Sequence, residues 1–239
     1  MAELILVRHG QASAFEADYD KLSEVGHRQA RLLGQHWAQS GVQLDSVVCG
    51  SLRRHQETLA AVKEAYDAKG LRFPDVEEDA GWDEYDAYAV IGRLGPLLAE
   101  QDDDFALIQK RAQQEMSGPH RNRFFQRAFE ALMAAWVEQR VAAEDVESFS
   151  HFHTRVMDAR SRLIARSGAG RIAVFTSGGP IGVNVQATMQ APLLQAMHIN
   201  SRVRNASLTH FLFSAGRVSF DRFNLVPHLE HDPSLITFR

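Results

Sequence analysis

The sequence predicts an α/β fold, specifically a three-layer α/β/α sandwich with a mostly parallel mixed sheet and an inserted helical cap. Three observations support this prediction. Short apolar runs end in charge or glycine, helical patterns follow them, and a long stretch in the middle is amphipathic and helical without strands. Alternating strands and helices are typical of a largely parallel sheet covered on both faces. With 239 residues, we expect a single domain, 1–239, with 81–167 as the cap.

The first strand and helix lie at the start of the chain. Leu4 to Val7 is a short apolar run that stops at Arg8, as a fully buried strand does at the functional edge of a sheet. From 23 to 39, apolar residues recur at helical spacings, and Gly41 is placed to end the helix.

The same pattern returns twice. "DSVVCG" (45–50) is a second expected strand and precedes a helix over 52–69. "RIAVFTSGG" (171–179) is an expected strand with a tight turn, and Pro180 suits the first turn of the helix that runs on to about Gln190. Between them lie the two long amphipathic stretches of the cap, and near the end "SLTHFLFS" and "RVSFDRFN" alternate like a β-hairpin joined by Ala215 and Gly216.

Composition disfavours several classes of protein. The net charge is −4 and the pI is near 6.3, so no broad attraction to nucleic acid or to an anionic membrane is expected. Cys49 is the only cysteine, which excludes an intrachain disulfide and indicates a reducing compartment. No secretory or membrane-spanning segment is evident. We expect a cytoplasmic protein without nucleic-acid or membrane partners.

Polar groups follow three of the expected strands. Arg8 and His9 follow the first, Arg54 lies shortly after the second, and a glycine-rich turn from Ser177 follows the third. In open α/β sheets such groups converge beyond the carboxyl ends of the strands. Two arginines, a histidine and a glycine-rich helix start suit a phosphate group.

The motifs "LVRHG", "SLRRHQET" and "TSGG", with "LSEVGHRQA" (22–30) and "NASLTHF" (205–211), resemble the histidine phosphatase superfamily, also called phosphoglycerate mutase-like. The resemblance covers nearly the whole chain. It implies that His9 is the nucleophile, that Arg8 and Arg54 hold the phosphoryl oxygens, and that neither metal nor cofactor is needed. It places a general acid within "GWDEYD" (81–86), where we favour Glu84 over Asp83 and Asp86.

One position departs from the family. A second histidine normally precedes the glycine of the late turn, and Ser177 stands there. Losing such a donor costs roughly 10²–10³ in rate. Ser177 could serve as a donor in a working variant, His151 or His153 could fill the gap, or turnover could be lost while phosphate binding survives. Besides Ser177, the expected phosphate-binding residues are Gly178, Gln11 and Ser13.

The function expected is that of a metal-independent phosphomonoesterase that forms a phosphohistidine and acts on a phosphorylated small molecule. The alternative from another class is a phosphate-ligand binding or regulatory module with weak or no turnover. A phosphoglycerate-type mutase is the lesser enzymatic alternative. Neither the identity of the substrate nor the oligomeric state is predicted.

Overall fold

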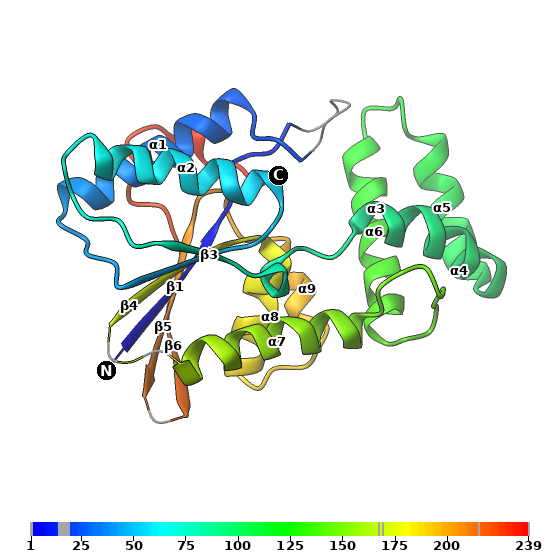
Figure 1. Ribbon diagram of the computed structural model, residues 1–239. Coiled ribbons are helices and arrows are strands. Elements are labelled where there is room, and N and C mark those ends of the chain that lie inside the picture. Colours follow the sequence, from blue (N-terminus) through cyan, green and yellow to red (C-terminus); the bar gives the residue numbers. More distant parts are fainter. Residues whose placement is uncertain (1, 14–19, 167, 169, 215, 239) are drawn as a thin grey trace. The chain divides into compact units, whose positions relative to one another are not determined.

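The computed structural model describes residues 2–13, 20–166, 168, 170–214 and 216–238. The chain divides into two compact units, one made of 1–84 with 155–239 and the other of 85–154. The larger unit contains a β-sheet, and the smaller unit is helical (Figure 1).

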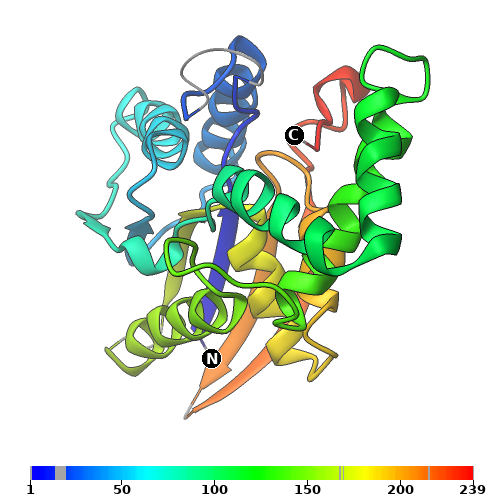
Figure 2. The same cartoon turned by 90° about the vertical axis from the view of Figure 1, so that its right-hand side faces the viewer.

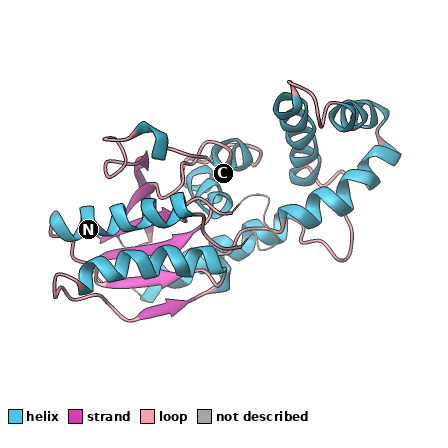
Figure 3. Ribbon diagram, turned by 90° about the horizontal axis from the view of Figure 1, so that it is seen from above, coloured by secondary structure: helices cyan, strands magenta, loops and turns pink. Residues whose placement is uncertain are grey.

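The sheet of the larger unit is mixed and has six strands among the described residues, in the order β3-β2-β4-β1-β5-β6. β1 and β2 each pair in parallel with β4, β2 pairs in parallel with β3, and β5 runs antiparallel to both β1 and β6. Figure 3 draws the strands in magenta. The strands are β1 (Ala2–Arg8), β2 (Ser46–Cys49), β3 (Val76–Glu78), β4 (Arg171–Thr176), β5 (Leu208–Ser214) and β6 (Arg217–Leu225). The predicted fold class is confirmed.

β1 lies inside the sheet because its side chains are apolar on both faces. Leu4 and Leu6 belong to one buried cluster, whereas Ile5 and Val7 belong to the other. Strands buried on both faces have this continuous apolar pattern. Two core layers therefore sandwich the sheet.

Helices cover both faces of the sheet. The cluster around Ile5 and Val7 is closed by α1 (Glu24–Gln39) and α2 (Arg53–Asp67), which contribute Leu33 and Val62 among others. The opposite cluster receives residues of α8 (Gly178–Thr188) and of the part of α7 (Phe149–Arg166) that belongs to this unit. Figure 1 shows α1 and α2 on one side of the sheet and α8 with α9 (Gln195–Asn200) on the other.

The start of α1 is fixed against the loop that follows β1. Ser23 caps the helix, and its side chain accepts a hydrogen bond from the Gly26 amide at 3.1 Å. A Cβ on Gly26 would lie 2.1 Å from the Gln11 carbonyl oxygen, and one on Gly10 would lie 2.5 Å from that of Gly26. Only glycines permit this approach, which brings α1 onto the residues beside His9.

The helical unit contains six elements and an aromatic core, and most of it is drawn in green in Figure 2. Its elements are α3 (Ala87–Ala89), the π-helix η2 (Val90–Leu94), α4 (Gly95–Gln101), α5 (Asp103–Gln114), α6 (Arg121–Val137) and the first residues of α7. The ring of Trp136 lies 4.8 Å from that of Tyr85 and 5.2 Å from that of Phe149, centroid to centroid. Aromatic packing of this kind gives the unit a hydrophobic centre of its own.

Across the described ranges, no helix combines the length and the apolar character that crossing a bilayer would require.

Candidate active site

The ends of β1 and β4 bring the first group of predicted site residues together. Arg8 and Thr176 form the last pair of the two strands, and the amide of His9, the next residue, donates a hydrogen bond to the Thr176 carbonyl at 2.9 Å. The Gly10 amide donates to Thr58 Oγ1 on α2 at 3.0 Å. His9 is thus fixed between the turn after β4 and the first turns of α2.

The hydrogen bonding of His9 defines which ring nitrogen can react. Nδ1 lies 2.7 Å from the Gly10 carbonyl oxygen. A carbonyl can only accept, so Nδ1 carries the proton and the lone pair is on Nε2. Burial lowers the pKa of His9 well below its ordinary value, and the charges of Arg54, Arg8 and His55 lower it further. The imidazole is therefore neutral near pH 7 and suited to nucleophilic attack.

Two buried guanidinium groups lie close enough to His9 to act on its pKa. Arg8 Nη1 donates to the carbonyl oxygens of Val203 and Phe238, the latter at 3.0 Å. Arg54 Nη1 pairs with Asp20 Oδ1 at 2.5 Å. These bonds fix both cations beside the imidazole, where they can bind an oxyanion with paired donors.

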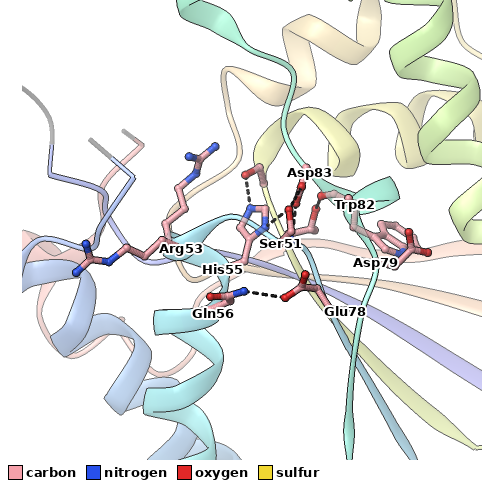
Figure 4. Close-up of polar contacts among 12 residues, drawn as sticks. Ser51, Arg53, His55, Gln56, Glu78, Asp79, Trp82 and Asp83 are labelled. Carbon is pink, nitrogen blue, oxygen red and sulfur yellow. Dashed lines mark hydrogen bonds and ion pairs between the residues drawn. The ribbon is translucent and has the colours of Figure 1, made fainter. Parts of the chain in front are cut away.

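Ser177 belongs to a row of interacting polar side chains that sequence reasoning did not anticipate. Its Oγ lies 2.6 Å from His55 Nε2, and His55 Nδ1 lies 3.5 Å from Asp83 Oδ1. The Ser51 amide donates to Asp83 Oδ1 at 2.7 Å, and the Ser51 hydroxyl donates to Oδ2 (Figure 4). Ser177 and His55 are both 0% exposed.

The surroundings of His55 and Asp83 determine the charge of each side chain. Burial lowers the pKa of His55 below its ordinary value and outweighs the opposing effect of Asp83. Burial would raise the pKa of Asp83, but hydrogen bonds from His55 and Ser51 lower it overall. The Asp83 carboxylate therefore lies beside a neutral His55 imidazole.

His55 is a candidate functional residue that sequence reasoning missed. It precedes Thr58, Leu59 and Val62 by three, four and seven residues, so it shares the buried face of α2. A histidine on the apolar face of a helix, directly after a predicted phosphate-binding arginine, was the available signal.

The three candidate acids have different surroundings. Glu84 Oε2 accepts a hydrogen bond from the Gly179 amide at 3.0 Å, in the first turn of α8. Asp83 binds His55 and Ser51 instead. Asp86 caps α3 in the helical unit, where its side chain accepts from the Ala89 amide. Glu84 is thus the candidate that borders the glycine turn.

The remaining predicted phosphate-binding residues have the following contacts. The Gln11 amide donates to Gln29 Oε1 at 2.8 Å, while Gln11 Oε1 accepts from the Ser23 hydroxyl. Ser13 Oγ donates to the Leu22 carbonyl at 3.2 Å. A Cβ on Gly178 would lie 2.2 Å from Asn200 Oδ1, so the turn has no room for a side chain there. Their contact with a phosphate stays a prediction.

The two histidines considered as substitutes have contacts within the helical unit. His151 Nδ1 lies 3.0 Å from Glu147 Oε1, and the His153 ring centroid lies 5.9 Å from that of Phe149. Within the described parts of the chain, no three histidine, cysteine or carboxylate side chains are grouped so as to hold a metal ion.

Comparison with known proteins gives a family match and several similar folds. The family model of the histidine phosphatase superfamily (branch 1) matches residues 4–139 and 114–226. A search of curated proteins found no match. Among solved structures, Bacillus stearothermophilus YhfR is 18% identical, with a TM-score of 0.66 over 96% of this chain and 100% of its own.

Two further structures have the same fold. A mycobacterial glucosyl-3-phosphoglycerate phosphatase, Rv2419c, in complex with inorganic phosphate is 21% identical, with a TM-score of 0.61 over 95% of this chain and 99% of its own. The alpha-ribazole phosphatase from Shigella flexneri is 18% identical, with a TM-score of 0.59 over 93% of this chain and 96% of its own. Since the family match spans most of the sequence and the fold agrees with it, the chain belongs to branch 1 of the histidine phosphatase superfamily.

Proposed function

We propose that the protein is a metal-independent phosphomonoesterase that hydrolyses a phosphorylated small molecule through a phosphohistidine at His9. The observation that carries this proposal is the state of His9, whose Nδ1 donates to the Gly10 carbonyl while two guanidinium groups lower its pKa in addition to burial. The resulting arrangement joins a neutral nucleophile to a cationic phosphate site. The names of two similar structures, both phosphatases, agree with it.

In the first step, His9 Nε2 attacks phosphorus, the P–N bond forms and the ester P–O bond breaks in line. The electron pair of that bond goes to the leaving oxygen, which takes a proton from the carboxyl group of Glu84. Arg8 and Arg54 stabilise the negative charge of the equatorial oxygens in the transition state. The alcohol leaves, and the phosphoryl group remains on His9.

In the second step, water attacks the phosphohistidine. The Glu84 carboxylate accepts a proton from that water while the P–N bond breaks, and its electron pair returns to Nε2. Inorganic phosphate leaves, and both His9 and Glu84 regain their starting protonation states. The cycle requires no group beyond the chain, substrate and water.

The test is phosphate release from an aryl phosphate between about pH 5 and 8, with a chelator present throughout. We expect the wild type to release phosphate and His9→Ala to release it at least about 10³-fold more slowly. The control His198→Ala, which removes an exposed histidine, should release phosphate at the wild-type rate. Intact-mass analysis of quenched enzyme should show one added phosphoryl group in the wild type and none in His9→Ala.

Other outcomes would contradict the proposal. Turnover that survives His9→Ala, or that disappears with the chelator, excludes the mechanism. If inorganic phosphate raises the melting temperature while no ester is hydrolysed, the protein is a phosphate-ligand binding or regulatory module. Transfer of the phosphoryl group to a second position of a phosphoglycerate, without release of phosphate, would indicate a mutase.

A further inference from the structure

We propose that His55 is a positioning residue that supplies, through the Ser177 hydroxyl, the imidazole that the turn after β4 lacks. The proposal rests on the proposed function. Ser177 occupies the position where the family resemblance expects a histidine, and His55 Nε2 reaches its Oγ from α2 at 2.6 Å. The imidazole is thereby supplied by a different element of the fold.

The location of His55 fits this role. Its ring centroid lies 5.8 Å from that of His9, and it directly follows Arg54 in the first turn of α2. Protonation of His55 would lower the pKa of His9 further. A positive charge on His55 would therefore be felt at the reacting centre.

A second, independent observation shows that the fold makes room for this group. A Cβ on Gly50 would lie 2.3 Å from His55 Nδ1 and 2.6 Å from Asp83 Oδ1. Any other residue directly after β2 would thus collide with both members of the pair. Ser51, the next residue, donates two hydrogen bonds to Asp83 and fixes the carboxylate behind the ring. The strand end is shaped to hold an imidazole and its carboxylate.

The proton arrangement explains what His55 does. In the unliganded protein the neutral ring accepts from the Ser177 hydroxyl at Nε2, so that proton is directed away from any ligand. When a phosphate dianion binds, His55 takes up one proton from solvent. Nε2–H then donates to Ser177 Oγ, and the hydroxyl turns its own proton to a phosphoryl oxygen. Ser177 becomes a donor backed by positive charge.

Several charged groups act on His55 and decide when it takes up this proton. Asp83 behind the ring and Asp20 favour the imidazolium, whereas Arg54 opposes it. His9, 5.8 Å away, is neutral near pH 7 and adds no charge. A bound dianion adds negative charge and tips the balance toward the imidazolium.

The test is a double-mutant cycle with His55→Ala, Ser177→His and the two combined, assayed for kcat/KM on an aryl phosphate. His55→Ala leaves Ser177 without its imidazole, and Ser177→His forces a second ring onto a buried first one. We expect kcat/KM to fall roughly 10²-fold in each single variant, as it does when one oxyanion donor is lost. The double variant moves the imidazole to the turn and should recover to within about tenfold of the wild type.

His55→Gln tests the charge and guards against misfolding of the alanine variant. An amide can donate to Ser177 but cannot become cationic, so we expect a folded protein with kcat reduced about tenfold or more and KM changed less. The wild-type pH profile of kcat should contain an ionisation that is missing in His55→Gln. Losses in the two single variants that simply add in the double variant, or a His55→Gln enzyme equal to wild type, would overturn the proposal.

A second readout separates this proposal from the proposed function. If the wild type releases no phosphate, the esterase proposal fails, and the cycle is then read by the shift in melting temperature with inorganic phosphate. The shift should fall in both single variants and return in the double variant. An equal shift in all four proteins would refute the role of His55 by itself.

Discussion

His228 is expected to make the stability of the protein depend on pH. The residue is 5% exposed, and it lies in the sequence between Val226 and Leu229, which belong to a buried apolar cluster. Its ring centroid is 6.3 Å from that of His36. Burial chiefly, with the charges of His36 and His231, lowers its pKa to about 3. The folded protein therefore keeps this ring neutral at pH values where an unfolded chain would protonate it.

The direction and size of the effect follow from linkage. The unfolded value is about 6.5, so between about 3 and 6.5 the unfolded state binds more protons than the folded state. The free energy of unfolding therefore falls as pH falls through that window and is unaffected by His228 above about pH 7. At pH 5, which lies 1.5 units below the unfolded value, the loss is about 2 kcal/mol, at roughly 1.36 kcal/mol per unit.

The perturbation is His228→Leu, assayed by denaturant unfolding at pH 7.5 and pH 5 with the fluorescence of the three buried tryptophans, Trp37, Trp82 and Trp136, as the signal. The decrease in the free energy of unfolding between the two pH values should be about 2 kcal/mol smaller in the variant, whatever the substitution costs in packing. His198→Gln, at an exposed site, should keep the wild-type decrease. An unchanged pH dependence in His228→Leu, or an NMR titration of His228 near pH 6.5, would refute the reasoning.

Two other groups of the larger unit give predictions. Glu84→Gln should reduce turnover of an alkyl phosphate by about 10²-fold or more but turnover of nitrophenyl phosphate much less. The reason is that only the alkyl phosphate, which has the poorer leaving group, needs a proton from the acid. Equal losses of turnover on the two substrates would exclude Glu84 as the acid. Burial chiefly, with Asp83 and Glu78, raises the pKa of Cys49 to about 12. The native thiol should therefore resist iodoacetamide at pH 8 while the unfolded chain reacts, and equal rates of alkylation would contradict this.

The sequence was most informative where burial leaves a pattern. β1, β2 and β4 are continuous apolar runs because helices cover both faces of the sheet, and each was predicted close to its observed bounds. β3 was not predicted. Its three residues are exposed at the edge of the sheet and owe their conformation to pairing with β2, so no local periodicity marks them.

The candidate site was less predictable because it depends on where side chains point. Asp83 and Glu84 are consecutive, yet one binds His55 on α2 and the other binds the first turn of α8. Successive side chains of an extended segment point to opposite sides, and the sequence does not state which side faces the site. The contact between His55 and Ser177 joins residues 122 positions apart, and this long-range contact depends on the parallel pairing of β2 with β4.

The order of the strands has a consequence for synthesis of the chain. β1 lies between β4 and β5, and Leu4 pairs with Ile172 and Phe211. At about 5–20 residues per second, roughly 8–34 s pass between translation of Leu4 and of Ile172. During that interval an apolar strand has neither of its neighbours, which is the situation in which nascent chains aggregate or engage chaperones. β1, which leads into His9, is thus synthesised long before its neighbouring strands, and the yield on expression should depend on the rate of translation and on chaperones rather than on the stability of the finished fold.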